Sequence, residues 1–149
     1  MTKRQKISSK DYLKGLKDTT ESLQNAVDDI EHGSVVGLAD ALLYVGTESQ
    51  QKAPVDTGDL RGSVLVELDG AKLAEGIKNG GITMSGSIPD SATVGSVSYN
   101  TPYAANQHEH TEYDHPRGGQ AKYLESVLIE NKDRILHLIA GGIMNELGG

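Results

Sequence analysis

The stretch APVDTGDLR, residues 53–61, separates a helical pattern from a strand pattern. Pro54 disfavours a helical conformation of the residue before it and therefore ends the preceding helix. Gly58 can adopt the positive φ that a tight reversal needs, and Leu60 then starts a new periodicity. We expect the turn at Pro54, Thr57 and Gly58 to set the angle between a helical half and a sheet half of the chain.

Upstream of this turn, apolar residues recur at steps of three and four, as they do on one face of a helix. Two helices are expected, over about residues 10–31 and 34–52, because Gly33 suits the position after a helix and Ser34 can cap the next one. The apolar stripe of the first helix is narrow, so this helix is expected to be half buried. The stripe consists of Leu13, Leu16, Leu23, Val27 and Ile30.

Downstream of the turn, apolar and polar residues alternate, which is typical of strands with one buried face. Three strands are expected, at about residues 60–69, 81–88 and 92–99. The links between them are too short for parallel crossovers, so they predict an antiparallel meander. Residues 70–80 fit either one helical turn or a long hairpin loop. A polar loop at residues 100–119 then precedes a last helix over about residues 121–140.

Together these elements predict an α+β fold, with an antiparallel sheet of three to four strands packed against two or three amphipathic helices. The chain has 149 residues, which suits one domain. We assign that domain to residues 10–149 and expect residues 1–9 to be a basic flexible arm.

Composition and charge exclude several classes of protein. The chain has no Cys, so a disulfide framework, a thiolate zinc site and a Cys nucleophile are excluded. No apolar run approaches the roughly 20 residues of a membrane span, and we expect a soluble protein made inside the cell, with no membrane partner. Residues 1–20 carry six basic and two acidic groups, a net charge of +4. Because the whole chain has a net charge of −7, the remaining residues carry −11. Such an acidic body argues against a DNA-gripping surface.

The polar loop holds a cluster of metal-ligating residue types. A His-x-His pair with a third His and nearby carboxylates could bind a divalent metal. The loop is flanked by Gly and Pro and has no fixed register, so we favour a hydrogen-bonded interface loop and expect no cofactor and no catalytic residue. A metal-binding or metal-dependent hydrolytic accessory protein stays open as the alternative. The cluster consists of His108, Glu109, His110, Glu112, Asp114 and His115.

Two blocks of residues resemble the tail-completion or head-tail joining proteins of long-tailed bacteriophages. The resemblance covers about residues 34–139. Tyr123 departs from it, because Phe is usual there, and the loop is unusually rich in His. The first block is Ala53, Pro54, Thr57, Gly58, Leu60, Arg61 and Ser63, and the second is Tyr103, Ala104, Glu109, Tyr123 and Leu124.

The resemblance implies a structural virion protein and not an enzyme. Such a protein forms a ring, expected to be a hexamer, between the head-side connector or stopper and the tail tube or tail terminator protein, and the genome passes through its lumen without sequence-specific binding. It is made in the host cytoplasm and resides in the phage neck or tail. A tail terminator and a minor capsid protein are the neighbouring alternatives.

Interface residues are expected in the polar loop and at the turn. Arg61 is expected to be free for a carboxylate on a neighbouring subunit. The first helix lies outside the main resemblance and is expected to clamp an adjacent subunit or ring. A further hypothesis, nucleic-acid binding by the basic arm, predicts salt-sensitive affinity. The candidates are Tyr103, His108, Glu109, His110, Tyr113, Arg117 and Arg61.

Overall fold

The structure is a computed structural model, and it describes residues 6, 8–55, 58–78, 80–113, 115 and 118–148. It confirms the expected α+β class, with one four-stranded antiparallel sheet and a set of helices. Most of the basic arm, as well as Thr57, Asp114 and Arg117, lies outside the described residues. Among those that are described, no helix is long and apolar enough to cross a bilayer.

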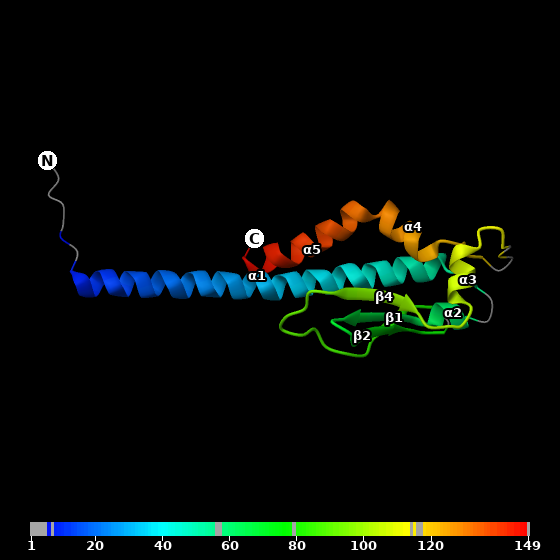
Figure 1. Cartoon of the computed structure of the whole chain (residues 1–149), viewed down its shortest axis with the longest axis horizontal. Coiled ribbons are helices and arrows are strands. Elements are labelled where there is room, and N and C mark those ends of the chain that lie inside the picture. The colour runs from blue at the N-terminus through cyan, green and yellow to red at the C-terminus, as the bar shows by residue number, and fades with distance from the viewer. Residues whose placement is uncertain are drawn as a thin grey trace.

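Helix α1, Ser9–Lys52, is 44 residues long and forms the axis of the molecule. At 1.5 Å per residue it spans about 66 Å. Its second half lies between the sheet on one side and helices α4 and α5 on the other, whereas its first half projects away from the rest of the chain (Figure 1). The side chain of Ser8 caps the start of the helix by accepting the N–H of Asp11 at 3.1 Å. The helix ends immediately before Ala53 and Pro54, as predicted.

The expected break between residues 31 and 34 is wrong, because α1 continues through it. Gly33 and Gly37 are buried here, and they face the last helix, α5 (Lys132–Glu146). A Cβ at Gly33 would lie 2.6 Å from the carbonyl oxygen of Gly142, and one at Gly37 would lie 2.8 Å from the Cα of Ile139. The glycines therefore allow close packing of two helices and do not end one.

The sheet has the order β3-β2-β1-β4, and every neighbouring pair is antiparallel. Strand β1 pairs directly with both β2 and β4, so the expected three-strand meander is wrong. The residues just after the turn form a short helix, and residues 71–76, left undecided above, form a strand. The elements are α2 (Asp59–Gly62), β1 (Val64–Leu68), β2 (Ala71–Gly76), β3 (Ile82–Met84) and β4 (Gly95–Tyr99).

A two-residue turn explains the strand that the sequence pattern missed. Asp69 and Gly70 both have positive φ, 47° and 79°, which is the backbone of the tightest β-hairpins. The Asp69 carboxylate also accepts the N–H groups of Thr93 and Val94, at 3.1 and 2.9 Å. These bonds hold the segment that enters β4 beside the hairpin, so β4 pairs with β1.

The main core lies between α1 and the sheet. Buried side chains of the helix meet those of β1 and β2, and each such side chain contributes about 1.5–3 kcal/mol on burial. Gly46 lets the sheet approach the helix, because its Cβ would lie 2.9 Å from the Cδ1 of Ile82. The buried cluster is Val35, Ala39, Val66, Leu68, Leu73 and Ala74.

The C-terminal third departs from the predicted loop and single helix. The loop contains α3 (Ala104–Glu109), and the last helical region is divided into α4 (Tyr123–Glu130) and α5 at Asn131. Asn131 accepts a hydrogen bond from the hydroxyl of Tyr44, at 3.0 Å, and this fixes the bend against α1. Gly141 and Gly142 do not end the helix, which runs on to Glu146.

Candidate interaction site

Tyr123, at the start of α4, is the centre of a small second core at the turn end of the molecule. Its ring meets those of Tyr99 and His108 edge to face, with centroids 5.0 Å apart in both cases. Its hydroxyl donates to the carbonyl oxygen of Ala104 at 2.9 Å. Burial raises the pKa of Tyr123 to about 12 and raises that of Tyr99 as well. Tyr99 bonds through its hydroxyl to Ser49 of α1 at 2.7 Å, so the cluster joins four elements.

His108 is a positioning residue in this arrangement and not an open surface group. Its side chain is only 17% exposed. The Nε2 atom accepts the backbone N–H of Glu125 at 3.2 Å, and Nδ1 lies 2.8 Å from the Glu109 carboxylate. An N–H at the first turn of a helix has no partner inside the helix, so His108 supplies one for α4.

An exposed ion pair lies beside it. Lys122, which precedes α4 with φ 56°, contacts the carboxylates of Glu109 and Glu125. Hydrogen bonds from Lys122 and then from His108 lower the pKa of Glu109, and the pKa of Lys122 is raised by the same contact. Pairs this exposed contribute little stability, so this one mainly orients α3 against α4.

The outer side of α3 and the residues after it present aromatic and charged groups together. Tyr103 and Tyr113 are 38% and 41% exposed. His110 stacks on Tyr113, with ring centroids 4.6 Å apart, and its Nδ1 lies 2.6 Å from the Glu112 carboxylate. Hydrogen bonding by His110 lowers the pKa of Glu112. We call Tyr103, Glu109, His110, Glu112 and Tyr113 the α3 surface; its mixture of aromatic area and polar tips suits a protein partner.

The three histidines proposed as metal ligands do not converge. His108 and His110 pair with different glutamates. Within the described part of the chain, no group of three His, Asp or Glu side chains is placed to hold a metal ion. His115 lies in the loop, and its Nε2 is buried without a hydrogen-bond partner among the residues described. Asp114, which belongs to the predicted cluster, lies outside the described residues, so the metal alternative stays a prediction without a three-ligand group among those that are described.

Arg61 is not free for a neighbouring subunit. Its Nε donates to the carbonyl oxygen of Ala53 at 2.9 Å, and one terminal nitrogen donates to that of Gln51 at 3.0 Å. These carbonyls belong to the end of α1, where no intrahelical N–H is available. The guanidinium therefore caps α1. Gly58 has the predicted positive φ, at 88°.

Sequence reasoning missed Gln50, which is 2% exposed and holds the turn to the sheet. Its Nε2 donates to the carbonyl oxygens of Arg61 and Gly81, at 2.9 and 2.7 Å, and its Oε1 accepts the N–H of Gly81 at 2.8 Å. The sequence did carry one sign of this role. Gln50 is a polar residue one helical turn after Gly46, on the face of the helix that meets the core.

The projecting half of α1 is a second candidate surface. It was expected to be half buried, yet residues 9–32 are exposed, apart from partial cover at Ala26. Five large apolar residues and Thr20 follow one another at steps of three and four residues, and the five apolar ones are between 43% and 64% exposed. We call these positions the α1 seam: Leu13, Leu16, Thr20, Leu23, Val27 and Ile30.

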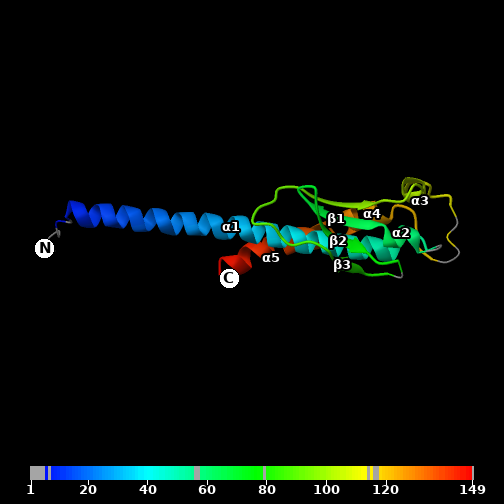
Figure 2. The same cartoon turned by 90° about the horizontal axis from the view of Figure 1, so that it is seen from below.

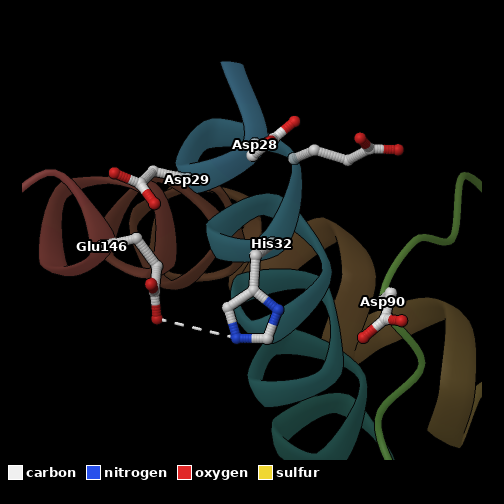
Figure 3. Close-up of a pocket in the computed structure, with 6 residues that line it drawn as sticks. Asp28, Asp29, His32, Asp90 and Glu146 are labelled. Atoms are coloured by element: carbon white, nitrogen blue, oxygen red, sulfur yellow. Dashed lines mark ion pairs between the residues drawn. The ribbon is translucent and has the colours of Figure 1, made fainter. Parts of the chain in front are cut away.

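An acidic hollow marks the place where α1 leaves the body (Figure 3). His32 lies 3.7 Å from the Glu146 carboxylate, across the junction of α1 and α5. The five carboxylates of this hollow repel an anion such as a nucleic-acid phosphate. The lining residues are Asp28, Asp29, Glu31, His32, Asp90 and Glu146.

Comparison with known proteins adds no relative to this description. No protein-family model matches the chain, no curated protein matches it, and no solved structure matches it.

Proposed function

We propose that the chain is a structural virion protein that assembles as a hexameric ring at the neck of a long-tailed bacteriophage. The two sequence blocks that resemble tail-completion and head-tail joining proteins, within residues 53–63 and 103–124, support this function. The structural observation that supports assembly with other chains is the α1 seam, because a monomer leaves these side chains in water; the ring itself rests on the resemblance. A contiguous apolar face of this kind marks a surface that another molecule covers.

The α3 surface is the docking surface in this proposal. It contacts the head-side connector or stopper protein, or the tail tube or tail terminator protein. Tyr103 and Tyr113 supply contact area with a polar tip, and the carboxylates of Glu109 and Glu112 supply charge. The core around Tyr123 keeps α3 in place, so the surface is already formed before the partner arrives.

The acidic charge of the chain suits a ring through which DNA moves. Outside residues 1–20 the net charge is −11, and the hollow at Asp28, Asp29 and Glu31 gathers part of it. Acidic side chains repel phosphates, so the genome slides past without sequence-specific binding.

Two neighbouring functions, tail terminator and minor capsid protein, use the same kind of assembly and differ in position within the particle. Metal-dependent hydrolysis is not favoured, since His108, His110 and His115 do not meet at one point. The ring proposal needs no cofactor and no membrane.

Head-to-tail joining tests the proposal. Purified protein is added to heads and tails that lack it, and joined particles are counted by negative-stain imaging. We expect the unchanged chain to restore joining and to appear between head and tail. A chain with His110→Ala and Tyr113→Ala is expected to fold but to join poorly. The control is Ile129→Ala on α4, a residue 71% exposed and outside the α3 surface. Normal joining by the double variant refutes the docking role, and protein found only elsewhere in the particle refutes the neck assignment.

A further inference from the structure

We infer that the projecting halves of α1 from two copies of this chain pair antiparallel along the α1 seam. The seam positions are separated by 3, 4, 3, 4 and 3 residues, which is the spacing of the core positions in a two-helix coiled coil. The residues of the opposite face, such as Lys14, Asp18 and Glu21, are polar, and Lys14 bonds to Asp18 at 3.4 Å. The projecting half of the helix therefore has one continuous apolar edge, and that edge lacks a partner within the chain.

The body shows how the same edge is covered elsewhere. Gly37 and Tyr44 follow Ile30 at steps of seven residues, so they lie on the same edge of α1 as the seam. Both contact the last helices. Gly37 packs against Ile139, and Tyr44 bonds to Asn131 and lies under the guanidinium of Arg134 at 5.9 Å. Residue numbers rise along α1 as they fall along α5, so this cover is an antiparallel helix.

That cover stops about halfway along α1. The C-terminal end of α5 lies beside the middle of α1 in both views (Figures 1 and 2). Its last ion pair joins Glu146 to His32, and the seam begins to be exposed from Ile30 towards the N-terminus. A second antiparallel helix continues an interface that the chain already builds.

The seam is complementary to itself in one antiparallel register. Leu13 then meets Ile30 of the second copy, Leu16 meets Val27, and Thr20 meets Leu23, so all six positions are paired. A shift of one heptad pairs only four of the six. The paired length, 18 residues, is about 27 Å, and the two bodies lie at its opposite ends.

Charge selects the same orientation. The positions that flank the seam on one side are Lys10, Lys17, Gln24 and Glu31. In the antiparallel register, Glu31 of the second copy lies between Lys10 and Lys17, level with residue 12 and therefore two residues from Lys10 and five from Lys17, and the contact occurs twice. In a parallel pair these positions face Tyr12, Thr19 and Ala26, which carry no charge. Flanking charges set orientation in paired helices, so the antiparallel pair is favoured.

The contact is two-fold and differs from the contact that closes a ring. The contact joins two monomers. If the bodies of several chains form a ring, the same contact joins two rings. It does not depend on the proposed function, because it uses only residues 10–31.

Cysteine crosslinking tests the register, and the natural chain has no Cys to interfere. Chains with Leu13→Cys are mixed with chains with Ile30→Cys and oxidised. We expect the mixed disulfide to form, and Leu13→Cys alone to form none, since residues 13 of the two copies lie about 26 Å apart in this register. Crosslinking of Leu13→Cys alone indicates a parallel pair and overturns the inference, as does the absence of any crosslink in the mixture.

Further variants test the apolar contact and the charge pairing separately. Leu16→Asp with Leu23→Asp is expected to weaken the pair at least about a hundredfold in sedimentation, because two apolar side chains lose their burial. Neither residue touches the body, so the melting temperature serves as the folding control. Lys10→Glu with Lys17→Glu, and separately Glu31→Lys, are each expected to weaken pairing of like chains, and a mixture of the two is expected to restore it. Unchanged association of the Leu variant, or no recovery on mixing, overturns the inference. Failure of head-to-tail joining with intact crosslinking affects only the proposed function.

Discussion

Replacing Gly37 by Ala tests the close packing of α1 on α5. The nearest atoms to the new Cβ are backbone atoms of Ile139, with its Cα at 2.8 Å. Backbone atoms cannot rotate away as a flexible side chain can, so one of the two helices must shift. Overpacking of this kind costs about 1–3 kcal/mol. Ala also favours a helix over Gly by about 0.8–1.0 kcal/mol, which offsets part of that cost.

Gly15→Ala is the matched control, because it lies in the same helix with no atom within 4 Å of its Cβ. Both variants gain the same helix propensity, so the difference between them isolates the packing cost of about 1–3 kcal/mol. Urea unfolding followed by circular dichroism measures both free energies. We expect Gly37→Ala to be the less stable of the two by that amount. Equal stability refutes the account of α1 and α5.

Three further predictions concern the turn and the tyrosine core. Arg61→Met is expected to lower the free energy of unfolding by about 1.5–3 kcal/mol, since hydrogen bonds to charged groups contribute that much and Ala53 loses its cap; an unchanged urea midpoint contradicts the capping role. Tyr123→Phe is expected to cost about 1–2 kcal/mol because the carbonyl of Ala104 loses its donor. The exposed control Tyr103→Phe is expected to change stability by less than about 0.5 kcal/mol. Tyr123 has its pKa raised from 10.0 to about 12, so between these values the unfolded chain binds fewer protons than the folded one and stability falls as pH rises. Tyr123→Phe is expected to flatten this fall in chemical unfolding experiments, and an equally steep fall counts against the assignment.

The turn was predictable because its residues act locally. Pro54 ends a helix through its ring, and Gly58 reverses the chain through its positive φ, and neither effect needs a distant partner. The alternation in residues 64–68 is equally local, and this part of the expected strand is confirmed.

Elements that depend on distant partners were not predictable from the same patterns. Gly33 was interpreted as a helix end, but Gly142, far along the chain, gives it a packing role. Strand β2 has a weak strand pattern and exists because the Asp69 turn folds it back on β1.

The interface residues predicted from the sequence stay a prediction, and the structure shows which of the described ones use their polar atoms inside the chain. The described residues of this loop lie at one end of the molecule, around α3 (Figure 1). His108 and Arg61, however, use their polar atoms inside the chain, and a single sequence does not indicate which polar group finds an internal partner. Gln50 was missed for the same reason.

The mass of the purified chain in solution, measured by light scattering over a range of concentrations, tests the central claim most directly. One chain has a mass of 15.9 kDa, and six therefore have about 95 kDa. A closed ring is expected at that mass, or at twice that mass where the α1 seams join two rings. A mass that stays at one or two chains at every concentration contradicts the ring.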